Sequence, residues 1–72
     1  MNELMIILDC EPAMWIYFKT HETDVKEAIG DYHSVCELSG INTDNAPIRA
    51  AVLRDANDSQ LGVWNKKGVW EP

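Results

Sequence analysis

Two cysteines and two histidines are the residues of this 72-residue chain whose types could bind a metal ion or act as a nucleophile. His33 and Cys36 lie three positions apart, a spacing that lets two side chains on one helix share a metal ion. Cys10 and His21 lie far from this pair, and the sequence holds no Cys-x-x-Cys knuckle. A Cys–His nucleophile also needs an orienting third group and a glycine-rich turn, and no such motif accompanies the pair. The sequence therefore predicts no enzymatic activity, no metal and no cofactor.

Carboxylates are more prominent than these thiols and imidazoles. The net charge is −6, and residues 1–48 hold nine carboxylates against two lysines. Asp24, Glu27 and Asp31 are spaced i, i+3 and i+7, so a helix would project all three from one side. Such a row complements a basic groove on a protein partner. The acidic charge argues against direct binding of nucleic acid or an anionic membrane. The alternative is a solvated face that keeps the chain soluble.

Aromatic side chains form a second candidate set. Trp15 and Tyr17 alternate with three apolar residues over residues 14–18, so a strand would place both aromatic side chains on one face. Trp and Tyr are enriched among the residues that dominate protein interfaces, which makes this pair the predicted anchor for a partner. Trp64 and Trp70 are predicted either to cover a thin core or to lie across a hairpin on one face.

One helix and several strands must position these residues. The helix is predicted within residues 20–39, with Thr20 or Thr23 as its N-cap and Gly40 just after its end. Its core-facing stripe consists of apolar residues at helical spacing: Val25, Ala28, Ile29, Tyr32, Val35 and Cys36.

Strands are predicted at residues 4–8, 14–18, 60–65 and 69–71, the first of them covered on both faces. Residues 47–54 fit either a strand that pairs with 60–65 or a second short helix over 47–55, with Pro47 in its first turn. The favoured fold is α+β, a single domain over 1–72. One helix packs on an antiparallel sheet of four to five strands, in the order ββαβββ.

The expected location of the protein is the cytoplasm. No apolar run reaches the roughly 20 residues that cross a bilayer. Residues 1–8 are apolar, but they lack the basic start of an export signal. Two cysteines do not make a disulfide framework, so both are expected to be reduced thiols.

In size, acidity and helix-on-sheet order the chain resembles the small inhibitors of host defence that bacteriophages and mobile elements encode, the anti-CRISPR proteins among them. Its end, an aromatic hairpin of Leu61-Gly62-Val63-Trp64 with Gly68-Val69-Trp70, contributes to this resemblance. The resemblance implies a stoichiometric inhibitor that covers the nucleic-acid site of a basic bacterial protein or nucleoprotein complex. The residues predicted to contact this partner are Asp24, Glu27, Asp31, Trp15 and Tyr17.

The alternative is a small regulatory or self-associating subunit, such as an antitoxin or a phage assembly component. It would form a homodimer through an apolar edge strand, for which Val69 and Trp70 are the candidates.

Overall fold

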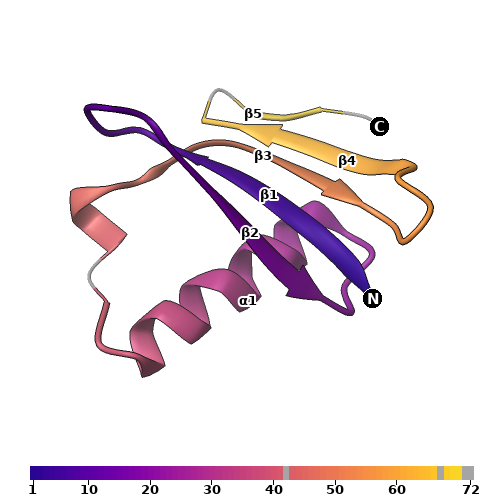
Figure 1. The fold of residues 1–72 in the computed structure, drawn as a ribbon, viewed down its shortest axis with the longest axis horizontal. Coiled ribbons are helices and arrows are strands. Elements are labelled where there is room, and N and C mark those ends of the chain that lie inside the picture. The colour runs from indigo at the N-terminus through magenta and orange to yellow at the C-terminus, as the bar shows by residue number, and fades with distance from the viewer. Residues whose placement is uncertain (42, 67, 71–72) are drawn as a thin grey trace.

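The computed structural model describes residues 1–41, 43–66 and 68–70, and it contains a five-stranded antiparallel sheet with one helix packed on it (Figure 1). The strand order is β2-β1-β3-β4-β5. The elements follow one another along the chain as β1 (Asn2–Leu8), β2 (Met14–Thr20), α1 (Val25–Leu38), the 3₁₀ turn η1 (Thr43–Asn45), β3 (Ile48–Arg54), β4 (Gln60–Asn65) and β5 (Gly68–Trp70). The predicted α+β class and the order ββαβββ are confirmed.

Strand β3 resolves the two interpretations of residues 47–54. It lies between β1 and β4 and pairs antiparallel with both, so its backbone groups are bonded on two sides. The alternative of a second short helix over 47–55 is wrong, because a helix there would leave both neighbouring strands without this partner. The 3₁₀ turn η1 precedes the strand in this region.

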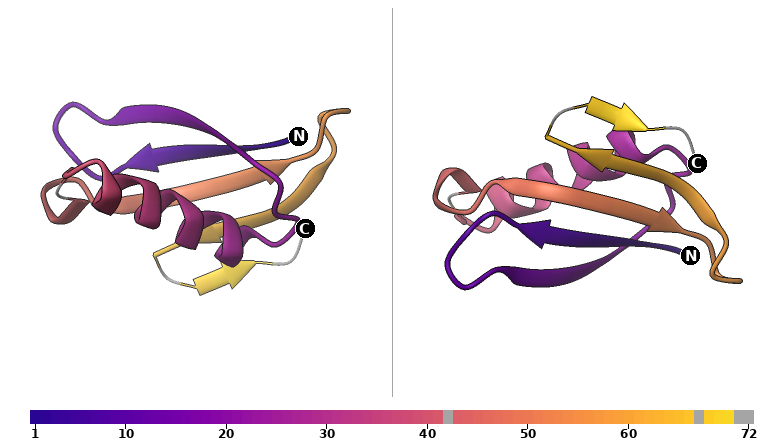
Figure 2. Two further views of the ribbon diagram at one scale, coloured as in Figure 1. Left: turned by 90° about the horizontal axis from the view of Figure 1, so that it is seen from below. Right: turned by 90° about the horizontal axis from the view of Figure 1, so that it is seen from above.

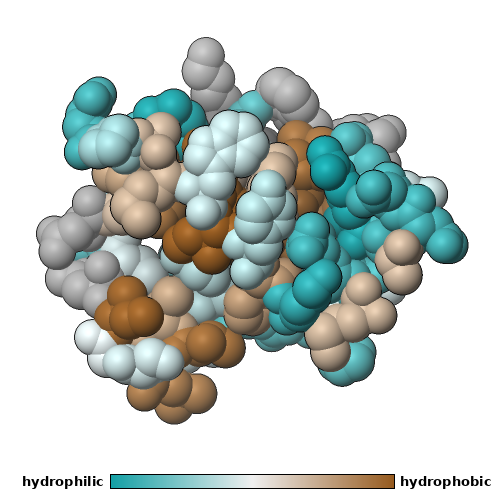
Figure 3. All heavy atoms as spheres, in the orientation of Figure 1, coloured by the Kyte–Doolittle hydropathy of each residue, from teal (hydrophilic) through white to brown (hydrophobic). Residues whose placement is uncertain are grey.

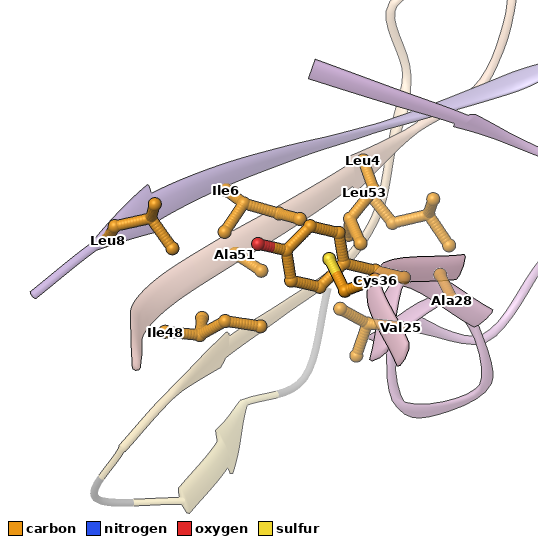
Figure 4. Close-up of a cluster of buried hydrophobic side chains, with 10 residues drawn as sticks. Leu4, Ile6, Leu8, Val25, Ala28, Cys36, Ile48, Ala51 and Leu53 are labelled. Carbon is orange, nitrogen blue, oxygen red and sulfur yellow. The ribbon is translucent and has the colours of Figure 1, made fainter. Parts of the chain in front are cut away.

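The core lies between α1 and one face of the sheet. Figure 2 shows the helix in front of the strands from below and behind them from above. The buried side chains come from β1, β3 and α1 (Figure 4): Leu4, Ile6, Leu8, Val25, Ala28, Tyr32, Cys36, Ile48, Ala51 and Leu53. Full burial of one leucine or isoleucine contributes about 1.5–3 kcal/mol, so Leu4, Ile6 and Leu53 are the main anchors.

The opposite face of the sheet is not covered by the helix. Met5 and Ile7 of β1 point to this outer face and remain half-buried, whereas Leu4, Ile6 and Leu8 are buried. The prediction that residues 4–8 are covered on both faces is therefore wrong. A continuous apolar run does not distinguish a strand covered on two faces from a central strand with one open face.

The start of α1 differs from the prediction. Asp24 is the N-cap, with φ −112° and ψ 133°, and its Oδ2 accepts a hydrogen bond from the backbone N–H of Glu27 at 3.3 Å. Thr20 and Thr23 do not cap the helix. Thr20 is the last residue of β2, where its side chain is buried under the helix.

The end of α1 follows the sequence closely. Gly40 has a φ of +77°, which glycine adopts without steric cost, and the N–H of Ile41 donates to the carbonyl of Cys36 at 2.8 Å. Val35 is 47% exposed, however, so its place in the core stripe was predicted wrongly. Leu38 and Ile41 are exposed as well. Figure 3 shows brown, hydrophobic side chains gathered at the lower left, where α1 ends.

Candidate functional site

The three predicted carboxylates lie in the first half of α1 and at its N-cap. Asp24 and Glu27 are exposed, and Asp31 is half-buried. Glu27 and Asp31 are one helical turn apart and therefore share a side of the helix. The capping bond of Asp24 fixes its carboxylate at the start of the same helix.

Thr20 connects this part of the helix to the end of strand β2. Its hydroxyl donates to Oδ2 of Asp31 at 3.4 Å and accepts from the backbone N–H of Glu22 at 3.1 Å. The side chain of Asn2, at the start of β1, donates to the carbonyl of Glu22 at 2.7 Å. These bonds fold the connection between β2 and α1 back against the sheet, so the carboxylates lie beside the edge strand β2.

Glu22 joins the three carboxylates through this turn. Its carboxyl shares a hydrogen bond with Asp31, and this bond raises the pKa of Glu22 from its ordinary value. Repulsion from Asp31, Glu27 and Asp24 raises it further. We call Glu22, Asp24, Glu27 and Asp31 the acidic cluster. Sequence analysis missed Glu22 because it precedes the helix, and only the bend at residues 21–24 brings it to Asp31.

Among the described residues, no ion pair neutralises the acidic cluster. The ion pairs among the described residues are Lys19 with Glu3, and Asp9 with both Arg49 and Lys66. None of them includes a member of the cluster. Glu22 contacts Asp31 and is repelled by the charges of Glu27 and Asp24 as well, and a cation from outside the chain would relieve that repulsion.

Unlike the carboxylates of the acidic cluster, Asp9 forms ion pairs with cations of the same chain. It lies beyond the far end of β1, about 20 Å from Asn2 at the usual rise of a strand. Lys66 and Arg49 hydrogen-bond to its carboxylate, and both lower its pKa. This network joins the ends of β1, β3 and β4, and it leaves Asp9 neutralised.

Trp15 and Tyr17 lie on the outer face of the sheet, where they are 58% and 61% exposed. Trp15 is opposite Ile7 of β1, and Tyr17 is opposite Met5. Apolar residues at paired positions continue this surface across β3 and β4. We call the whole set the outer apolar face: Met5, Ile7, Trp15, Tyr17, Val52 and Val63.

The predicted carboxylates and the predicted aromatic pair therefore lie on opposite faces of the sheet at β2. Thr20, which contacts the acidic cluster, points to the helix side of this strand. Tyr17 and Trp15 are an odd number of residues away and point to the outer side. Because β2 is an edge strand, a partner that surrounds this edge would contact both sets. Trp64 packs partly buried against the core and pairs with Val69 rather than Trp70, so the prediction that the two tryptophans lie across from each other is wrong. The side chain of Trp70 lies outside the described part of the structure.

A groove that shares no residue with the acidic cluster or the outer apolar face runs along the second half of α1. Its volume is about 510 Å³, and its lining comes from the helix and the segment after it: His33, Glu37, Gly40, Ile41, Thr43 and Asp44. No sequence motif predicts this groove, since its walls form only when the helix and the segment after it fold together. His33 is exposed in this groove, whereas Cys36 is buried, and burial beside Cys36 raises the pKa of Tyr32 to about 12. The described residues contain no group of three or more His, Cys, Asp or Glu side chains that could hold a metal ion.

Comparisons of the chain with family models, with curated proteins and with solved structures found no match. Among the described residues, no helix has the length and apolar character needed to cross a membrane. The acidic cluster and the outer apolar face are therefore the surfaces that indicate a function.

Proposed function

We propose that this chain is a non-enzymatic inhibitor that binds a basic protein or nucleoprotein complex of a bacterial host, in the manner of the anti-CRISPR proteins. One observation carries the proposal. The edge strand β2 has on one side an acidic cluster that no ion pair of the described residues neutralises, and on the other side two aromatic side chains, each more than half exposed.

The acidic cluster supplies the recognition of a basic surface. The hydrogen bond of Glu22 with Asp31 raises the pKa of Glu22, repulsion from the neighbouring carboxylates raises it further, and lysine or arginine side chains of a partner would relieve that repulsion. Opposite charges also accelerate the encounter of two proteins and select against acidic partners. Protein surfaces that bind nucleic acid are rich in lysine and arginine, so an acidic protein that occupies such a surface excludes the nucleic acid.

The aromatic pair supplies the anchor. Charged contacts at the rim of an interface mainly govern the association rate, whereas buried Trp and Tyr side chains account for much of the affinity. Trp15 and Tyr17 are already held by the sheet, so little conformational freedom is lost when a partner covers them. We assign the electrostatic contacts to Asp24, Glu27 and Asp31 and the anchoring contacts to Trp15 and Tyr17.

The proposal is tested by affinity capture from bacterial lysate, with tagged protein, washes of increasing salt and mass spectrometry of the bound fraction. We expect one basic nucleic-acid-handling protein or complex, retained at low salt and released as salt rises, because salt screens exposed charges. The variant Glu27→Lys/Asp31→Lys should lose this partner. Circular dichroism must show that the variant keeps its fold, because Asp31 is half-buried and accepts a hydrogen bond from Thr20.

The matched control is Glu11→Lys/Glu37→Lys, which changes the net charge equally at two exposed residues outside the acidic cluster. It should retain the partner. Equal retention by both double variants, or equal loss in both, would mean that the acidic cluster does not recognise the partner. A captured protein that resists high salt would contradict the electrostatic part of the proposal.

A further inference from the structure

We propose that two copies of this chain associate through β2, whose edges pair antiparallel about Tyr17 to form one continuous ten-stranded sheet. The pairing places both helices on the same face of that sheet. This inference goes beyond the proposed function and does not rest on it. It also moves the predicted self-association from the C-terminal strand to the opposite edge.

Within the described chain, strand β2 is an edge of the sheet with an unpaired backbone side. It pairs with β1 in unbroken register over all seven of its residues, and its other side faces no strand of the described chain. Natural edge strands avoid association with free lysines or other charges, proline or bulges. Strand β2 has no proline and no break in register, and its one charged residue, Lys19, is held by Glu3 at 2.9 Å. The other edge, β5, is only three residues long.

Strand β2 also complements itself. In an antiparallel pair centred on Tyr17, residue 15 of one copy lies opposite residue 19 of the other. Trp15 therefore meets Lys19 of the second copy on the outer face, and a lysine beside a tryptophan ring is attracted to it. On the helix side Ile16 meets Phe18 of the second copy. Both are only partly covered in the single chain, so the pairing covers apolar surface there.

Charge also bears on this pairing, because each copy carries a net charge of −6. Thr20, which contacts the acidic cluster, lies three residues from the centre of the pair. The two clusters are therefore about 20 Å apart along the strand direction. This separation is more than twice the screening length of about 8 Å at physiological salt. Repulsion thus permits the dimer, and the dimer should strengthen as salt rises.

The pairing leaves the side chains of the proposed binding residues uncovered but closes the edge of β2 that the proposed partner surrounds, so the dimer and the partner complex compete. Both acidic clusters remain on the helix side, and Trp15 and Tyr17 of both copies form one stripe at the centre of the outer face. A seam of seven residue pairs is small beside the roughly 1,600 Å² of a standard interface, so the dimer is expected to be weak. Its population must therefore depend on protein concentration.

Sedimentation equilibrium of the untagged protein tests this inference, over a wide range of protein concentration at two salt concentrations. The mass should rise from the monomer value of 8.2 kDa toward twice that value, and more readily at the higher salt. A monomer at every concentration would overturn the inference. The salt response is opposite to that expected for a basic partner, so the two associations are distinguishable and each can fail alone.

Two substitutions of one residue test the register. Trp15→Lys places a lysine opposite Lys19 of the second copy and should weaken the dimer at least tenfold. Trp15→Glu places a carboxylate opposite the same lysine and should retain the dimer. The net charge alone predicts the reverse order, because the glutamate variant is the more negative one. Circular dichroism checks that both variants fold.

The control is Leu38→Lys, which removes an apolar side chain that is 89% exposed at the end of α1 and adds a positive charge there. It should leave the dimer unchanged. Equal weakening by both Trp15 variants, or loss of the dimer in Leu38→Lys, would overturn the pairing of β2.

Discussion

The contact between Glu22 and Asp31 shows how one hydroxyl group sets the chemistry of the acidic cluster. Thr20 bonds to the backbone of Glu22 and to the side chain of Asp31, and so holds two carboxyls of like charge within reach of each other. Their proximity favours a proton on Glu22. The folded chain therefore binds that proton more tightly than the unfolded chain does.

The sign of the resulting pH dependence follows from this shift. A carboxyl whose pKa is raised on folding contributes stability that is fully present below its unfolded pKa and is lost as pH rises through its folded pKa. We expect Asp31→Asn to return the pKa of Glu22 toward its ordinary value, because the asparagine carries no charge and can still accept from Thr20. Carboxyl chemical shifts followed by NMR against pH measure this directly. An unchanged titration of Glu22 in the variant would mean that Asp31 is not the cause of its shift.

Two glycines belong to α1 and its end: Gly40 follows the helix and terminates it, and Gly30 lies within it without a packing role. Gly40 ends the helix with a φ of +77°, whereas nothing lies within 4 Å of the position that a Cβ of Gly30 would occupy. Gly30→Ala should therefore stabilise the fold by about 1 kcal/mol, since alanine loses less backbone freedom in a helix. Denaturation in urea measures the change as a shift of the midpoint at constant slope.

Gly40→Ala is the matched control for that substitution. It adds the same methyl group at a positive φ, where an L-residue is strained, and should destabilise the fold by about 1 kcal/mol. If Gly30→Ala were destabilising, a contact or a motion that needs glycine at position 30 would have to exist.

At the same scale, local patterns predicted the elements well where each pattern had one interpretation. Alternation at residues 14–18 placed Trp15 and Tyr17 on the open face, and the helical stripe placed Val25, Tyr32 and Cys36 in the core. The patterns failed where residues far apart in the sequence determine the local structure. The N-cap is Asp24 because Thr20 is already bonded at the end of β2, and 47–54 is a strand because β1 and β4 flank it.

Val35 is exposed for a related reason, which only the three-dimensional arrangement reveals. Val35 lies at the edge of the apolar stripe of α1, and its side chain stays exposed although Cys36 beside it is buried in the core. The composition of the candidate site depends on arrangement in the same way. Asp24, Glu27 and Asp31 follow from helical spacing, whereas Glu22 and the open outer face follow from a bend and from the single helix.

At the scale of the whole molecule, the acidic cluster and the ion pairs of Asp9 lie at opposite ends of β1. The acidic cluster lies near Asn2, at one end, and the ion pairs of Asp9 with Arg49 and Lys66 lie beyond Leu8, at the other. Exposed ion pairs contribute little to stability, so the folded state loses little when salt screens them. Repulsion within the acidic cluster is screened at the same time, and its loss is a gain for the folded state.

The net effect of salt on folding is thus expected to be stabilising. We predict that the thermal midpoint of the native chain rises as sodium chloride is increased from low to physiological concentration, and that Glu27→Gln/Asp31→Asn shows a smaller rise. Glu11→Gln/Glu37→Gln, with the same net charge, should behave like the native chain, because its substitutions lie outside the acidic cluster. Equal slopes for the two double variants would show that net charge, rather than the arrangement of these four carboxylates, governs the response. The rise of the thermal midpoint with salt concentration therefore measures the repulsion that a basic partner would relieve, even before that partner is identified.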